Sequence, residues 1–208
     1  MRSQDSGPRL APAERSSPDS DEWALRVDLA ALYQLLHLKN LGDRIFTHHS
    51  ARLPGVSDRI LLNPFGLHLD EVTATKLIRI GRDGSTVEDE SFEANKAAAI
   101  IHWAVYDARP DIYCIIHHHA PECVAVASMK CGLLPLTQVG MQFHNRVGYH
   151  AYEGLSFDSD EKSRLATDLG RHNVLMLKNH GVLVCGSSVS EAYVRADDLQ
   201  NACATQVL

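Results

Sequence analysis

Three consecutive histidines, in the segment CIIHHHAPE (residues 114–122), follow a short apolar run. The run at residues 113–116 favours a buried strand, because it is rich in β-favouring residues and follows the breaker Arg109-Pro110-Asp111. Side chains at positions i and i+2 of a strand share one face. We therefore expect His117 and His119 to point at one place, where two imidazoles can bind one metal ion, and His118 to face away.

The best candidate for a third ligand lies in the segment VLMLKNHGVLVCG (residues 174–186). Here His180 separates two apolar strand segments and precedes Gly181, a residue that can adopt a positive φ and turn the chain sharply. With His117 and His119 it would form a three-histidine site with an open coordination position, which is typical of catalytic zinc. A lone histidine is more often hydrogen-bonded within a core, but the H-x-H and N-H-G motifs together favour the metal site.

The elements that must position these histidines alternate along the chain. Helical patterns cover residues 22–42, 70–77, 92–108, 121–130, 160–171 and the segment from residue 189 onward. Apolar, β-favouring runs predict strands within residues 44–53, 59–64, 133–138, 146–152 and 174–186, and a hairpin within residues 77–87. This alternation predicts an α/β domain in which helices pack on a sheet.

Composition limits the class of protein. The chain has 208 residues, of which 45% are hydrophobic, and this suits one domain over residues 22–208 behind a disordered leader at residues 1–21. Its net charge of −6 provides no basic patch for nucleic acid, and no apolar run is long enough to insert into a membrane. Its five cysteines lack CxxC spacing and indicate reduced thiols in a cytoplasmic protein.

Four segments together resemble the class II aldolase/adducin family: GDRIFTHHSARLPG, ILLNPFGLHLDEVT, IHWAVYDARPDIYCIIHHHAP and LKNHGVLVCG. Two others, ASMKCGLLPLTQ and VGYHAYEG, are more similar to adducin heads and their bacterial relatives than to sugar-phosphate aldolases. The resemblance implies a three-layer α/β/α domain with a central mixed, largely antiparallel sheet. It also implies a homotetramer and a divalent metal ion, most often Zn²⁺, whose ligands fall on His117, His119 and His180.

Two departures from the aldolase pattern bear on the reaction. In the aldolases an acid/base glutamate lies four residues before a histidine that matches His102, and its position here is Ala98, which cannot transfer a proton. The positions that hold substrate phosphate in the aldolases are likewise changed, and are here His48, Phe65, Lys96 and Ala97. These two departures from the aldolase pattern therefore disfavour an ordinary phosphosugar aldolase.

The remaining chemistry is that of a metal ion without the usual base. Such an ion can bind two oxygens of a 2-oxo or 3-oxo acid and stabilise an enolate. Decarboxylation then needs only a proton donor, for which the sequence offers His150, Tyr149 and His48. We therefore expect a lyase that decarboxylates a small oxo or hydroxy acid or cleaves its C–C bond, and Lys96 could attract such an anion.

Two other functions stay open at the level of sequence. Imidazole suits Fe²⁺ as well as Zn²⁺, so the same residues could serve a non-haem iron oxygenase. Loss of the glutamate also fits a non-catalytic, adducin-like scaffold, although a scaffold has no need of an open metal site. Retention of all three histidines favours an enzyme.

Overall fold

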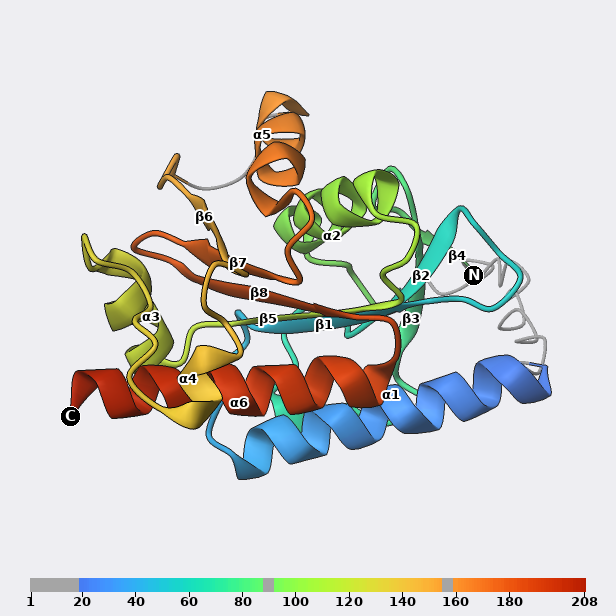
Figure 1. Cartoon of the computed structure of the whole chain (residues 1–208). Coiled ribbons are helices and arrows are strands. Elements are labelled where there is room, and N and C mark those ends of the chain that lie inside the picture. Colours follow the sequence, from blue (N-terminus) through green and yellow to red (C-terminus); the bar gives the residue numbers. More distant parts are fainter. Residues whose placement is uncertain (1–18, 88–91, 155–158) are drawn as a thin grey trace, which may run out of the picture.

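A single mixed sheet forms the centre of the computed structural model, which describes residues 19–87, 92–154 and 159–208 (Figure 1). The neighbouring strands, in spatial order, are β4 (Thr86–Val87), β3 (Ile78–Gly81), β2 (Arg59–Leu62), β1 (His48–Arg52), β5 (Cys114–His118), β8 (Gly181–Gly186), β7 (Val174–Leu177) and β6 (Gly148–His150). Within this described sheet, β6 and β7 are parallel and the other neighbours are antiparallel. The predicted mixed, largely antiparallel sheet is confirmed.

Helices cover both faces of the sheet. One face carries α1 (Ser20–Leu38), α3 (Pro121–Ser128), α4 (Gln138–Met141) and α6 (Val189–Val207), and the other carries α2 (Lys96–Ala108) and α5 (Ser159–Leu169) (Figure 1). Two separate hydrophobic cores result, because neighbouring strand residues point to opposite faces: Ile116 packs in the core under α1 and α6, and Ile115 in the core under α2 and α5. The predicted three-layer α/β/α architecture is confirmed.

Side chains at the helix starts explain where the helices begin. Asp19 caps α1 by accepting a hydrogen bond from the amide of Glu22, at 2.8 Å. Asn95 caps α2 in the same way, by accepting from the amides of Ala97 and Ala98. Since α1 begins at Ser20, the last residues of the predicted leader belong to its first turn, and residues 1–18 of that leader lie outside the described residues.

Two predicted elements are wrong. The expected strand at residues 133–138 is a turn followed by α4, because Pro135 has no amide proton for a sheet and Thr137 caps the helix by accepting from the Gly140 amide at 2.9 Å. The expected helix at residues 70–77 shrinks to one 3₁₀ turn, η1 (Leu69–Glu71). The backbone is already extended at Val72, and β-branched residues follow it, which disfavours helix propagation.

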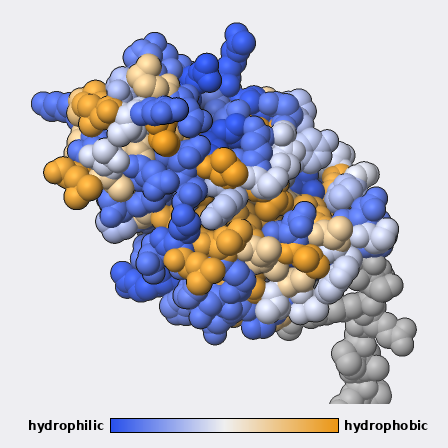
Figure 2. Space-filling model, turned by 60° about the horizontal axis from the view of Figure 1, so that its bottom comes forward, coloured by the Kyte–Doolittle hydropathy of each residue, from blue (hydrophilic) through white to orange (hydrophobic). Residues whose placement is uncertain are grey.

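The outer surface of the α1 and α6 layer is mixed in polarity. Figure 2 shows hydrophobic residues lying among hydrophilic ones on this side of the molecule. The exposed apolar residues of the two helices include Trp23, Val27, Leu35, Leu38 and Val194. None of the helices that the structure describes is both long and apolar enough to cross a lipid bilayer.

A buried ion-pair network joins α1 to β3. The carboxylate of Glu22, which is 7% exposed, accepts hydrogen bonds from Arg79 Nη2 at 2.6 Å and from Arg26 Nε at 2.7 Å. The Arg26 guanidinium also donates to the Leu77 carbonyl at 2.6 Å. Burial alone would raise the pKa of Glu22, but the hydrogen bonds and positive charges of Arg79 and Arg26 outweigh it and hold this pKa below its ordinary value.

We predict that Glu22→Gln lowers the free energy of unfolding at pH 7 by about 3 kcal/mol, because a neutral amide replaces the buried carboxylate that accepts charge-assisted hydrogen bonds from Arg26 and Arg79. Urea denaturation measures this difference. It should shrink as the pH falls below the unfolded-state value of 4.5, since a depressed carboxyl pKa contributes stability above that value and loses it on acidification.

The matched control is Asp107→Asn, which breaks the pair of Asp107 with Arg82, whose side chains are 49% and 51% exposed. An exposed pair of this kind contributes at most about 1 kcal/mol. Equal losses of stability in the two variants would contradict a special role for Glu22.

Candidate metal centre

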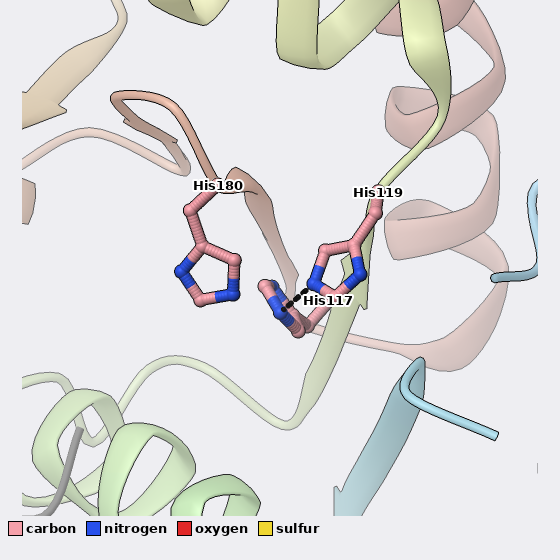
Figure 3. Close-up of side chains that lie close together, drawn as sticks. All are labelled: His117, His119 and His180. Carbon is pink, nitrogen blue, oxygen red and sulfur yellow. Dashed lines mark hydrogen bonds between the residues drawn. The ribbon is translucent and has the colours of Figure 1, made fainter. Parts of the chain in front are cut away.

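Three histidines from two chain segments converge at one end of the sheet (Figure 3). His117 lies near the end of β5, His119 follows that strand, and His180 immediately precedes β8. Their ligand nitrogens all lie within 4.8 Å of one another, and the Nε2 atoms of His117 and His119 are 2.9 Å apart. The ring centroid of His180 lies 4.9 Å from each of the other two centroids. We call these three residues the histidine triad.

Hydrogen bonds behind two of the rings determine which nitrogen faces the centre. His117 Nδ1 lies 3.0 Å from the Val182 carbonyl, and His119 Nδ1 lies 3.1 Å from Asp43 Oδ2. A carbonyl and a carboxylate accept protons, so both Nδ1 atoms carry one and both Nε2 atoms present lone pairs to each other. Two facing lone pairs are unfavourable unless a cation lies beside them. The donor set therefore fits a divalent metal ion, and such outer partners are typical of ligating histidines.

Two imidazoles of the triad, those of His117 and His180, are held in their neutral form. Burial, followed by the nearby imidazoles of His48, His119 and His180, lowers the pKa of His117 well below its ordinary value. Burial, with smaller contributions from His119 and His150, lowers the pKa of His180 to about 4. Neutral imidazole is the form that binds a metal ion, so neither of these two groups needs to lose a proton first at pH 7.

The turn before β8 does not use the glycine that the sequence suggested for its positive φ. The residue in the left-handed region is Asn179, with φ 58°, and not Gly181. An Asn tolerates this conformation better than most side chains do. Gly181 is required for another reason: a Cβ there would lie 2.5 Å from the His118 carbonyl oxygen and 2.7 Å from His119 Cδ2. The missing side chain lets the start of β8 approach the end of β5.

The triad lies in the wall of a cleft of about 800 Å³. Apolar side chains supply part of the lining, among them Phe46, Ile101, Val124 and Ala125. Polar groups supply the rest, including Asp43, Arg44, His48, Asn95 and Tyr152. A largely apolar cleft with a few converging polar groups is the usual form of a small-molecule site.

The three predicted proton donors lie at different places. His48 lines the cleft and is paired in register with His117, so that their ring centroids are 4.6 Å apart. His150 lies behind His180 in a small adjoining cavity, where its Nδ1 donates to Asp168 Oδ2 at 2.7 Å. The Tyr149 hydroxyl accepts from the Leu133 amide at 2.9 Å. Within the described chain, only His48 of these three lines the cleft beside the triad.

The wall that α2 contributes to the cleft carries no titratable group. It consists of Asn95, which caps the helix, Ala97 and Ile101. Ala98 is fully buried in the core beneath, and Lys96 is not among the lining residues. Asp43 is the one carboxylate that lines the cleft among the residues described, and it is already engaged by His119.

Sequence reasoning missed two charged residues of the cleft, Asp43 and Arg44. Arg44 has φ 49°, an unusual left-handed conformation for a long side chain, and its side chain is 79% exposed. Its guanidinium lies 3.6 Å from the Asp43 carboxylate. Both residues occur in the quoted segment GDRIFTHHSARLPG, but no local pattern in the sequence predicts the loop conformation that places them in the lining of the cleft.

The middle histidine belongs to the core. His118 is fully buried, and its Nδ1 accepts from the Ala120 amide at 3.2 Å. On the neighbouring strand His49 is also fully buried, and its ring packs 4.7 Å from that of Tyr33 in α1. Strand alternation therefore separates His49 and His118 from the cleft, although they adjoin His48 and His117 in sequence.

Comparison with known proteins agrees with this architecture. Residues 27–207 match the family model for the Class II Aldolase and Adducin N-terminal domain. The chain belongs to the class II aldolase/adducin family. It is similar to a Pseudomonas aeruginosa protein named "Putative aldolase class 2 protein", at 44% identity over 90% of this chain and 72% of the relative. It is also similar to alpha-adducin of Rattus norvegicus, at 39% identity over 91% of this chain but only 26% of adducin.

Two solved structures illustrate the range of the family. An aldolase II superfamily protein from Pseudomonas syringae superposes with a TM-score of 0.90 at 42% identity, over 93% of this chain and 79% of that one. The L-fuculose 1-phosphate aldolase from Glaciozyma antarctica superposes with a TM-score of 0.81 at 25% identity, over 97% and 77%. The fold is therefore shared with a solved sugar-phosphate aldolase.

We predict that Gly181→Ala disturbs the triad. Its Cβ would meet a backbone carbonyl and an imidazole that cannot both give way, so we expect a loss of about 2 kcal/mol in the free energy of unfolding and weaker zinc binding. The matched control is Gly140→Ala, whose Cβ would meet its nearest neighbours only at 3.3 Å, within a helix. Zinc titration and urea denaturation of both variants test this, and equal behaviour would contradict the role of Gly181.

Proposed function

We propose that this protein is a metal-dependent lyase that decarboxylates a small oxo or hydroxy acid or cleaves its C–C bond. The observation that carries the proposal is the histidine triad, with two of its Nδ1 atoms held by Val182 and Asp43, in the wall of an 800 Å³ cleft. A divalent cation on this triad, Zn²⁺ before Fe²⁺, would supply the Lewis acidity that polarises a substrate oxygen.

The chain's own residues suit an acid as the substrate. Arg44 is the one Lys or Arg side chain among the described lining residues, and its planar guanidinium matches a carboxylate. Phe46, Ile101 and Val124 would pack against a short carbon skeleton and exclude water. The cleft thus offers a charge for one end of the substrate and an apolar wall for the rest.

The composition of the cleft argues against a phosphosugar. The α2 wall of Asn95, Ala97 and Ile101 has no cation for a phosphate, and Lys96 does not line the cleft. It also has no base to remove the hydroxyl proton that aldol cleavage requires. Decarboxylation avoids that step, because carbon dioxide leaves without prior proton abstraction, and His48 is the best placed of the three predicted donors to serve the reaction.

We also propose a cytoplasmic homotetramer. All five cysteines are free, as a reducing compartment would keep them. Tyr149, which is 37% exposed, and His150 would then contribute to catalysis only through a neighbouring subunit or a rearranged loop. Light scattering at micromolar concentration tests the assembly, and a monomer would contradict it.

Metal binding is the first test. Protein purified without a histidine tag and without oxygen should carry about one divalent ion per chain, and His119→Ala should lose it together with turnover. The control is His144→Ala, which removes an exposed histidine away from the triad and should leave the metal content unchanged. Elemental analysis measures the metal and identifies it.

A screen of 2-oxo and 3-oxo acids, with and without oxygen, then separates the three candidate functions. Release of carbon dioxide or a cleaved product without oxygen supports the lyase. Turnover that strictly requires oxygen would replace it with an iron oxygenase. Bound metal with no turnover under any condition would favour an adducin-like scaffold.

Recognition of the carboxylate is a separate prediction. Arg44→Met should raise KM for the best oxo acid between about 10-fold and 100-fold, because one charge-assisted hydrogen-bonding partner is lost. Lys96→Met is the control, since Lys96 does not line the cleft, and it should leave KM unchanged. Steady-state kinetics decide, and an equal rise in both variants would show long-range attraction in place of direct binding.

A further inference from the structure

A chain of buried polar side chains runs from the core to the cleft between β1 and α2. His48 Nδ1 lies 2.8 Å from His102 Nε2, and Ser50 Oγ lies 2.9 Å from the Tyr106 hydroxyl. A short hydrogen bond between Ser50 Oγ and His102 Nδ1 joins these two pairs. The geometry follows from the elements, because residues 48 and 50 share one strand face and residues 102 and 106 share one helix face.

The hydroxyl of Tyr106, at the buried end of this hydrogen-bonded series, determines the direction of the hydrogen bonds. The Tyr106 hydroxyl has two acceptors within reach, Ser50 Oγ at 2.9 Å and the Tyr113 carbonyl at 3.4 Å. That carbonyl already accepts from the Arg52 amide at 2.9 Å. The phenolic proton therefore belongs on the shorter bond to Ser50, since hydrogen bonds weaken quickly beyond their usual length.

The positions of the other protons follow from the position of the Tyr106 phenolic proton. Ser50 accepts from Tyr106 and donates its own proton to His102 Nδ1. A neutral His102 then carries its proton on Nε2 and donates it to His48 Nδ1. A neutral His48 can carry its proton only on Nε2, the ring nitrogen not used by His102. Each donor in the buried chain has an acceptor, and the last donor belongs to the residue that lines the cleft.

We infer that Tyr106, Ser50 and His102 act as positioning residues that fix His48 as an Nε2–H donor, which binds an acceptor oxygen of the substrate beside the triad. This inference rests on the proposed function for its substrate class, a carboxylate or oxo group. It assigns a role to three buried residues that otherwise serve no chemistry. It also explains why such polar residues occupy the interior between β1 and α2.

Burial supports the neutral state that the scheme assumes. It lowers the pKa of His102 to about 3, so this imidazole is neutral at pH 7. If the three hydrogen bonds that join these four residues ran the other way, His48 would carry its proton on Nδ1 and present a lone pair to the cleft. A lone pair on His48 Nε2 would repel a carboxylate, so the direction of these hydrogen bonds decides whether the site accepts an acid.

Two variants of His102 that are isosteric with each other should have opposite effects on the tautomer of His48. His102→Gln retains an N–H group that can donate to His48 Nδ1. His102→Glu places only an acceptor there when ionised, so it should reverse the tautomer of His48. In zinc-loaded protein, His102→Glu should weaken pyruvate binding about 10-fold, whereas His102→Gln should stay within about 3-fold of the wild type. Zinc content and thermal unfolding of each variant control for damage to the fold.

The tautomer itself can be observed without any substrate. In protein labelled with [¹⁵N]histidine, the chemical shifts of the two ring nitrogens show which one carries the proton. We expect a protonated Nε2 and a bare Nδ1 for His48 in the wild type, and the reverse in His102→Glu. A wild-type His48 that carries its proton on Nδ1 would overturn the inference, even if the variants fail to fold.

The two readouts also separate this inference from the proposed function. If the wild type binds no pyruvate, the proposed substrate class fails. The ¹⁵N chemical shifts of His48 still show the direction of the hydrogen bonds between Tyr106 and His48. If pyruvate binds equally well to the wild type and to His48→Phe, His48 does not contact the substrate and the inference is wrong. The expected result is about 10-fold weaker binding by His48→Phe.

Discussion

The pairing of β5 with β8 is the interaction on which the candidate site depends. It brings residues 117 and 119 next to residue 180, which is about sixty positions away in the chain. The two strands approach closely only because Gly181 has no Cβ to meet the His118 carbonyl. The same pairing places the Val182 carbonyl where it can hold the ring of His117. Backbone packing and ligand orientation are therefore set by one contact between strands.

Several histidine side chains beside the cleft are buried, and this burial is the second constraint on the candidate site. An imidazole in a core is costly unless its nitrogens have partners, and three of the rings that line the cleft have one. His117 and His119 use a carbonyl and a carboxylate, and His48 uses another histidine. These partners hold the rings in fixed orientations and keep defined nitrogens turned toward the cleft. A metal ion or a substrate oxygen would then meet groups that need little reorganisation.

The family relationship explains the scaffold but leaves the reaction to the details of the cleft. The same fold occurs in an L-fuculose 1-phosphate aldolase, and the family model that matches this chain is named for both aldolases and adducins, so family membership alone does not determine the reaction. This chain combines the histidine triad with an α2 wall that carries no base, and Arg44 lines the same cleft. We propose that this combination suits Lewis acid chemistry in which α2 abstracts no proton.

The sequence by itself predicted helices packed on a sheet and a common face for His117 and His119, because both follow from local rules. The three-layer arrangement was implied by the family resemblance, and the pairing of β5 with β8 brings His180 beside the other two histidines. Strand alternation separates His117 and His119 from His118, and apolar periodicity marks the helices that cover the sheet. Local rules failed at residues 133–138 and 70–77, where a proline, a cap and β-branched residues prevailed over the apolar pattern. Only the tertiary structure decided that Arg44 turns toward the cleft, that Asn179 rather than Gly181 adopts the positive φ, and that His48 joins the buried chain through His102. Each of these depends on contacts between segments far apart in sequence, and no spacing within one segment encodes them.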